Sequence, residues 1–179
     1  MILARGLALI LVVLAGTAQA RDSVEVEIVA YGLFRADIVE KTRDTAGILH
    51  NVVANVCHIT TTRTVPARIG LHFGLRYRVT GPAAGARVLL RKGVVYPRVM
   101  TRPAPERPVS MVSSQLEFPV GATSYTDYAF EQPWEQVPGT WTFQFFESER
   151  KLAEFSFTVV EDDGGPLPGA EEATCFQVS

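Results

Sequence analysis

The chain has 179 residues, and its 17 basic and 19 acidic residues leave a formal net charge of −2. This length suits one domain with one hydrophobic core, since single domains run to roughly 100–200 residues. An export signal and an acidic C-terminal tail, both described below, fit poorly with nucleic-acid binding, so we expect no nucleic acid among the partners.

Residues 1–20 have the three parts of a secretory signal peptide. Arg5 supplies the basic part, residues 7–15 form an apolar run, and residues 18–20 fit a small-residue cleavage site. The apolar run is shorter than the roughly 20 residues that span a bilayer, and no later stretch is apolar enough to do so. We therefore expect no transmembrane span and a mature chain, starting at Arg21, that is periplasmic or secreted.

The first expected strand covers residues 24–31, where apolar and polar residues alternate. Gly32 is expected to end or bend this strand. Residues 35–53 mix charged and apolar residues without a clear period, and we interpret them as a long loop, with a helical turn or an irregular strand as alternatives. The loop leads into a strand at 56–62, which is rich in β-branched residues.

The clearest single strand covers residues 71–79, where every second residue is apolar. Glycine and proline at 81–85 predict a turn. Four prolines between 97 and 108 indicate an exposed connection rather than a central strand. Further strands are expected at 86–91, 111–120 and 124–131.

Residues 131–160 contain the most distinct β-hairpin. Pro138 and Gly139 form a turn, and the two strands that follow each alternate between aromatic and polar residues. The aromatic residues expected on one face are Trp141, Phe143, Phe145, Phe155 and Phe157. Such a face needs a second layer to cover it.

These segments amount to about seven or eight strands with short turns and no long helix. The pattern is typical of an all-β fold, an immunoglobulin-like antiparallel β-sandwich. A small β-barrel is the alternative, because the same alternation serves a closed sheet. We expect a single domain at 21–160, followed by an acidic tail with glycine and proline at 161–179.

Cys57 and Cys175 are the two cysteines of the chain, and both lie in the part expected to be exported. An oxidising compartment permits a disulfide, which would tie the acidic tail to the domain. Two free thiols, or a bond between two chains, are the alternatives. We expect the internal disulfide, because a tail of this composition has little else to order it.

Two blocks of residues match the pattern of a known family. Thr64 to Gly81 resembles VPAxxGxxFGxxYxxxG, and Phe130 to Phe157 resembles FE…WExVPGxWxF…RKLxExxF. Tyr31 and Gly32 resemble an early YG pair. On these residues the chain resembles an uncharacterised bacterial family, the domain of unknown function 3859. The resemblance implies a small exported β-sandwich without an established activity, and the family pattern includes neither Cys57 nor Cys175.

The sequence contains no motif of an enzyme or of a metal site. A GxSxG nucleophile elbow, a Gly-rich phosphate loop and an HExxH helix are all missing. His50, His58 and His72 do not stand at a metal-ligand spacing with one another or with the cysteines. His58 adjoins Cys57, so on a strand their side chains point to opposite faces. We therefore expect no catalytic residues, no metal and no cofactor.

The charges are unevenly distributed along the chain. Residues 63–107 carry ten basic residues and one acidic residue, whereas residues 108–179 carry two basic and twelve acidic residues. Four arginines are expected to face one another across a hairpin, Arg76 and Arg78 on one strand and Arg87 and Arg91 on the other. Either carboxylates on neighbouring strands neutralise them, or they form a basic patch for an anionic glycan or an acidic protein surface.

Trp134 lies before the hairpin, close to two glutamates. It is either an exposed aromatic platform for a ligand or a cap on the end of the core. The function that we predict is that of a non-catalytic exported module that binds another envelope component, a protein or an anionic polymer. An enzyme with a loop-built site at one end of the sandwich, and a purely structural envelope protein, are the alternatives.

Overall fold

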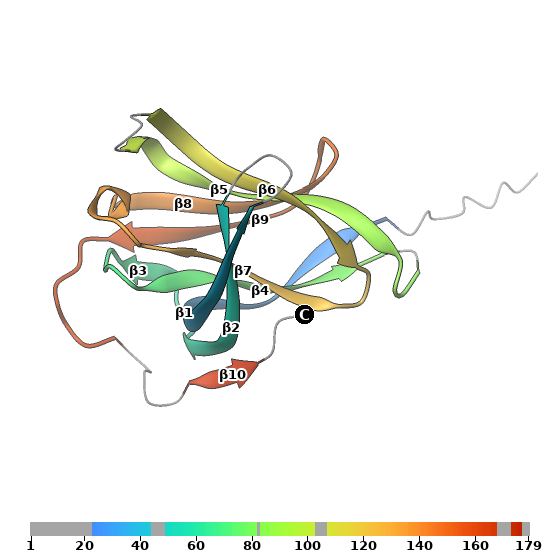
Figure 1. Cartoon of the computed structure of the whole chain (residues 1–179), viewed down its shortest axis with the longest axis horizontal. Helices are drawn as coiled ribbons and strands as arrows, with labels where there is room; N and C mark the ends of the chain where they lie inside the picture. Colours follow the sequence, from blue (N-terminus) through green and yellow to red (C-terminus); the bar gives the residue numbers. More distant parts are fainter. Residues whose placement is uncertain (1–22, 44–48, 82, 103–106, 168–172, 177–179) are drawn as a thin grey trace, which may run out of the picture.

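The computed structural model describes residues 23–43, 49–81, 83–102, 107–167 and 173–176. In these residues ten strands form two five-stranded sheets, which pack face to face (Figure 1). The strand order is β10-β2-β1-β4-β7 in the first sheet and β3-β9-β8-β5-β6 in the second. The expected signal peptide, residues 1–20, lies outside the described part of the chain.

The strands of the first sheet are β1 (Glu25–Arg43), β2 (Leu49–Thr60), β4 (His72–Thr80), β7 (Thr123–Ala129) and β10 (Thr174–Phe176). Those of the second are β3 (Thr64–Pro66), β5 (Arg87–Arg102), β6 (Arg107–Pro119), β8 (Gly139–Glu147) and β9 (Arg150–Val160). One 3-10 turn, η1 (Pro133–Glu135), precedes β8. The predicted β-sandwich is confirmed, and the sheets do not close into a barrel. Eight of the strands correspond to the seven or eight expected, and the three-residue strands β3 and β10 add to them.

The main hydrophobic core lies between the two sheets. From Trp141 to Phe145 in β8 and from Phe155 to Val159 in β9 every second side chain is buried, as the alternation predicts for a hairpin with one covered face. From the opposite sheet, β4 contributes Phe73, Leu75 and Tyr77, all without exposed surface. The Phe73 ring lies 5.9 Å from Trp141 and 5.3 Å from Phe157, so it joins the two layers. Both the predicted hairpin and the predicted strand at 71–79 are confirmed.

β1 and β2 are longer than the sequence predicts. β1 continues through Gly32 to Arg43 and pairs with β2 along this length, so the prediction of a long loop at 35–53 was wrong. Three register shifts interrupt the pairing after Leu33 and conceal the period-two pattern of a strand. Gly32 does not end β1; it is glycine because a Cβ there would collide with the backbone of Thr60.

β5 also extends further than expected, through Pro97 to Arg102. The prediction of an exposed connection from 97 onward was therefore wrong in part, and residues 103–106 lie outside the described chain. β5 has a neighbouring strand on both sides only as far as Val95, which is the last of its residues to pair with β8. Between Val95 and Met100 the register with β6 shifts, and Pro97 lies in this bulge. A proline is tolerated there because the bulge needs no ladder donor.

The acidic tail returns to the domain at two places. Near its start, the Arg68 guanidinium donates to both carboxylate oxygens of Asp162, at 2.9 and 2.6 Å. Near its end, β10 pairs antiparallel with β2, and Cys175 lies directly opposite Cys57. The two cysteines form a disulfide, which confirms the predicted pairing, and neither thiol is free. No helix among the described residues is long and apolar enough to cross a membrane.

Candidate binding pocket

The structure separates the four arginines that the sequence places together. Arg76 and Arg78 lie on β4, which pairs with β1 and β7, whereas Arg87 and Arg91 lie on β5, which pairs with β6 and β8. The predicted hairpin between these strands was wrong, because the turn after Thr80 carries the chain into the other sheet. A short turn with glycine and proline fits either connection, so the sequence pattern does not distinguish them.

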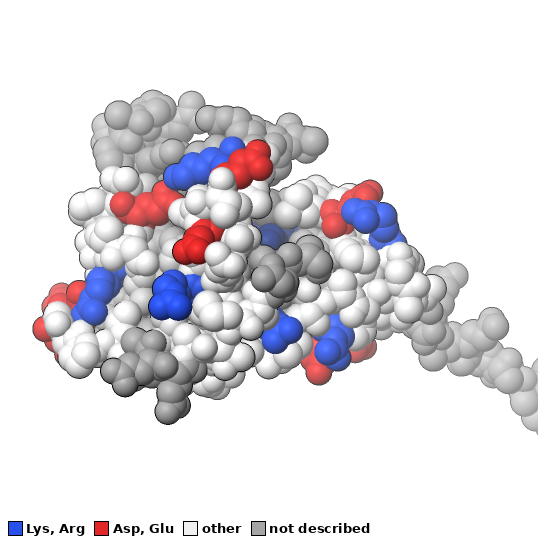
Figure 2. Space-filling view, turned by 60° about the horizontal axis from the view of Figure 1, so that its bottom comes forward, with Lys and Arg blue, Asp and Glu red and all other residues white. Residues whose placement is uncertain are grey.

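Each of the four arginines has a partner within the protein. Arg78 lies 3.6 Å from Glu27 and Arg87 2.8 Å from Glu117, while Arg76 stacks over Phe176 and Arg91 over Phe146, at 4.5 and 4.2 Å from the ring centroids. On the face shown in Figure 2, Lys and Arg are spread among Asp and Glu rather than gathered into one area. Carboxylates compensate two of the four arginines, Arg78 and Arg87, and the four do not form one continuous patch, because they lie in two sheets.

Trp134 lies in η1 and is partly buried against the main core. The carboxylate of Glu135, next to it, accepts hydrogen bonds from the backbone N–H groups of Glu131 and Gln132, at 2.7 and 2.8 Å. It also accepts one from the Tyr128 hydroxyl, at 3.1 Å. These contacts fix the loop against the end of the sandwich, where Trp134 covers the core.

A histidine–carboxylate pair that the sequence does not reveal lies on the first sheet. Nδ1 of His72 is 2.6 Å from a carboxylate oxygen of Asp127, on the face of the sheet that points away from the main core. Gly74 is the register partner of Asp127, and its missing side chain leaves room for this diagonal contact. No hydroxyl or thiol of the described residues is hydrogen-bonded to His72, so the pair lacks the nucleophile of a catalytic triad.

The His72–Asp127 pair predicts a pH dependence of stability. Burial lowers the pKa of His72, but the hydrogen bond and charge of Asp127, with a further contribution from Glu131, raise it above its ordinary value of 6.5. The pair therefore stabilises the fold fully below pH 6.5, and this contribution is lost as the pH rises through the folded pKa. In urea denaturation, the difference in unfolding free energy between the wild type and His72→Gln should shrink as the pH rises from about 6 to about 9.

Asp127→Asn provides the control for this prediction, because it removes the partner and leaves the histidine in place. The Asp127→Asn protein should lose the same pH-dependent part of the stability. A difference between wild type and His72→Gln that stays constant or grows with pH would contradict the assigned direction of the pKa shift.

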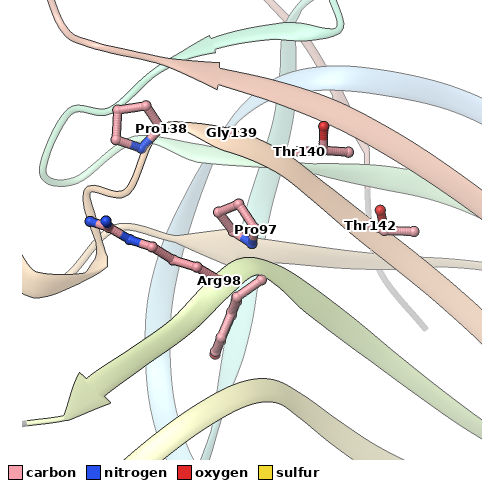
Figure 3. Close-up of a pocket in the computed structure, with 7 residues that line it drawn as sticks. Pro97, Arg98, Pro138, Gly139, Thr140 and Thr142 are labelled. Carbon is pink, nitrogen blue, oxygen red and sulfur yellow. The ribbon is translucent and has the colours of Figure 1, made fainter.

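A pocket lies in the second sheet, where β5 and β8 separate (Figure 3). The strands pair only between Arg91–Val95 and Thr142–Phe146, and beyond Val95 the bulge carries β5 away from β8. The space left has a volume of about 600 Å³. The residues that line it are Tyr96, Pro97 and Arg98 from the bulge, and Pro138, Gly139, Thr140 and Thr142 from the start of β8.

Gly139 determines how closely the bulge approaches β8. Its φ of +131° lies in a region that residues with a side chain rarely adopt. A Cβ at this position would lie 2.6 Å from the Cβ of Pro97, so any larger residue would push the bulge away. The proline and glycine that the sequence analysis assigns to a turn therefore also form one wall of the pocket.

The pocket offers hydrogen-bond donors without any carboxylate. Arg98 is exposed, and among the basic side chains that the structure describes it is the one without a carboxylate, sulfur or aromatic partner. Figure 3 shows the Arg98 side chain extending beside Pro138, with the threonines further along β8. Thr142 shares a hydrogen bond with Ser156, at 3.0 Å. The guanidinium of Arg98 at the rim of this pocket is suited to a carboxylate or another oxyanion.

Comparison with known proteins supports the fold and does not assign a role to the pocket. A family model described as "Domain of unknown function (DUF3859)" matches residues 22–159. The solved structure of an immunoglobulin-like protein from Pseudomonas aeruginosa has a TM-score of 0.55 and 25% sequence identity, and the match covers 79% of this chain and 99% of that one. A search of curated proteins gave no match.

Two β-glucosidases resemble the chain more weakly. One, from Erythrobacter marinus, has a TM-score of 0.34 and 13% identity, and the other, from Bifidobacterium adolescentis, has a TM-score of 0.33 and 10% identity. The matches cover 78% and 86% of this chain but only 16% and 19% of the two enzymes. Similarity at this level carries no conclusion about activity.

Proposed function

Since the chain belongs to the family of this domain of unknown function (DUF3859), we propose that it is a non-catalytic exported module that binds another protein of the cell envelope. The β5–β8 pocket is the binding site in this proposal, and an acidic segment of the partner is its ligand. The observation that carries the proposal is the guanidinium of Arg98, which has no partner among the described residues, at a pocket lined by threonines and prolines and, in the described chain, by no acidic residue.

The charge of the pocket supports an anionic ligand. Among the described residues Arg98 has no carboxylate partner, whereas Arg87, on the same strand, is paired with Glu117 at 2.8 Å. A carboxylate that binds Arg98 therefore displaces no acid of the described part of the chain. An exposed charge pair of this kind contributes about 1 kcal/mol or less, so neighbouring hydrogen bonds must supply the remaining affinity.

The backbone around the pocket favours a peptide over a glycan. Residues Gly139 to Trp141 pair with β9 on one side, and in the described residues they have no backbone partner on the side of β5. Pro97 lies against Gly139, so an extended segment of a partner would form main-chain hydrogen bonds here only next to this contact. A saccharide has no repeating backbone donors and acceptors of this kind. We therefore favour an acidic peptide segment, and the test below includes a glycan as a contrary outcome.

The proposed export supports the choice of an envelope partner. The N-terminal sequence has the pattern of a secretory signal, and the Cys57–Cys175 disulfide is compatible with an oxidising compartment. The ionisable residues that line the pocket are Tyr96 and Arg98. The His72–Asp127 pair lies on the other sheet and does not line it.

The test is capture of partners from an envelope extract by the immobilised protein and its Arg98→Gln variant. We expect the wild type to retain one or more proteins at low salt, with less capture at physiological salt because exposed charges are screened. Arg98→Gln should lose the same proteins. Mass spectrometry of the eluates measures this difference.

Arg87→Gln is the matched control, because it removes an equally exposed arginine of β5 that already has an acidic partner. It should capture the same proteins as the wild type. Equal capture by Arg98→Gln and the wild type would overturn the role of the pocket. Retention of an acidic polysaccharide in place of a protein would overturn the choice of ligand.

A further inference from the structure

The strand β10 occupies a second site, on the open edge of β2. It has only three residues, and its pairing connects Thr174 with His58 and Phe176 with Val56. Figure 1 shows β10 as a short, separate strand at the margin of the first sheet. Such a strand resembles an added peptide more than an integral part of a sheet.

One side chain of β10 enters an aromatic groove. Phe34, Val56 and Tyr125 form a small buried cluster of their own, apart from the main core, and Phe176 packs against it. The Phe176 ring lies 6.3 Å from Phe34 and 6.1 Å from Tyr125, edge-on to both. The Arg76 guanidinium covers the ring from the other side, at 4.5 Å from its centroid. We call these four receiving residues, Phe34, Val56, Arg76 and Tyr125, the aromatic groove.

The tail leaves two polar groups of the groove without a partner. Within the described part of the chain, Nε of Arg76 and the hydroxyl of Tyr125 are both buried and make no hydrogen bond. A buried donor without an acceptor costs about 1–3 kcal/mol. The Phe176 ring contacts the planar face of the Arg76 guanidinium but accepts no hydrogen bond from its Nε–H group. A segment with a carboxylate next to its aromatic residue would fit the groove more completely than the tail does.

The disulfide prevents the tail from leaving. Cys57 is buried, whereas Cys175 is exposed, so its sulfur is open to attack by a thiolate. A dithiol can open the bond in two exchange steps: its first thiolate attacks one sulfur to give a mixed disulfide, and its second thiolate displaces the remaining protein thiol. The dithiol becomes a cyclic disulfide, and the protein gains two thiols. Three residues of strand pairing and one side chain then hold β10.

We propose that the aromatic groove is a docking site for an extended segment of another protein, with an aromatic residue at the position of Phe176 and a carboxylate beside it. The tail is the built-in occupant, and the disulfide determines whether it can be exchanged. The site is separate from the β5–β8 pocket, because its residues come from β1, β2, β4 and β7 of the first sheet.

The test uses the full-length chain with Cys57→Ala, Cys175→Ser and Phe176→Ala, which keeps the tail but removes both its anchors. The probe is a fluorescent peptide with the sequence of residues 172–179, in which serine replaces Cys175. Fluorescence anisotropy should show binding to the triple variant at least about tenfold tighter than to the oxidised wild type. A peptide with alanine in place of Phe176 should lose at least about tenfold in affinity.

A second peptide tests the carboxylate. Thr174→Glu in the peptide places an acid two residues before the phenylalanine, on the same face of the strand. It should bind several-fold tighter than the parent peptide, and Arg76→Gln in the protein should abolish this gain. An equal affinity of the two peptides would overturn the acidic part of the proposal, and binding that does not depend on Phe176 would overturn the groove.

Hydrogen exchange of the wild type gives a measurement that needs no variant. Reduction by dithiothreitol should remove the protection of amides in β10 and of those amides of residues 56–58 that point toward β10, while β4 keeps its own. Unchanged protection of β10 after reduction would overturn the release of the tail. Light scattering should show that the reduced protein stays a monomer, because a dimer would mean that the groove takes the tail of a second copy instead of another protein.

Discussion

Replacement of Trp141 by alanine is expected to lower the free energy of unfolding by about 3–5 kcal/mol, the range for large aromatic residues in a core. Trp141 has no exposed surface, and its ring lies 4.8 Å from both Tyr96 and Tyr128. Its indole N–H also donates to the carbonyl of Val137, at 2.9 Å. Alanine therefore leaves both a cavity and a buried acceptor without its donor. Urea denaturation followed by far-ultraviolet circular dichroism measures the loss.

Two further variants separate these contributions. Trp141→Phe keeps most of the ring volume but removes the N–H, so it should cost about 1–3 kcal/mol, the penalty for a buried polar group left unpaired. Thr158→Ala, at an exposed position of β9, should change stability by less than about 0.5 kcal/mol. A loss of less than 1 kcal/mol for Trp141→Ala would mean that the aromatic face of β8 does not form the core.

The strands that the sequence predicts well are those with uninterrupted alternation. β4, β8 and β9 each keep one face covered along their length, so a period of two is visible in the residues themselves. The extension of β1 and β2 beyond Leu33 is hidden, because each register shift reverses which residues face the same side. The extension of β5 beyond Val95 is not visible in the sequence for a related reason, since the bulge at Pro97 resembles the end of a strand.

The candidate sites are harder to predict, because they depend on which strands become neighbours. Arg76 and Arg87 are close in sequence but lie in different sheets, whereas His72 and Asp127 are 55 positions apart and in contact. Arg98 is one of many arginines in the basic half of the chain. Its distinction is that it has no partner among the described residues, and this depends on the packing around it.

The C-terminal tail is likewise only partly predictable from the sequence. Two cysteines allow only one internal pairing, and the composition of the tail favours this disulfide over free thiols or a bond between two chains. The packing of Phe176 against Phe34 and Tyr125 is not visible in the sequence, since a three-residue strand has no period to recognise. The aromatic groove is therefore a feature of the structure alone.

Removal of the disulfide is the second change with a large expected effect. The bond joins residues 118 positions apart, and for a loop of this size the chain-entropy model gives about 4–5 kcal/mol at most. Native disulfides of small exported domains typically contribute about 2–5 kcal/mol, so we expect Cys57→Ala with Cys175→Ala to lower the unfolding free energy within that range. The midpoint of urea denaturation should fall accordingly.

Reduced wild-type protein provides the control, because it loses the bond but keeps both cysteine side chains. Most of the stabilisation comes from restricting the unfolded chain, so the reduced protein and the double variant should show nearly equal losses. A loss of less than about 0.5 kcal/mol in both would mean that the bond hardly restricts the unfolded chain. A cooperative transition retained after reduction is the result that the groove proposal requires, because the sandwich must stay folded when β10 leaves β2.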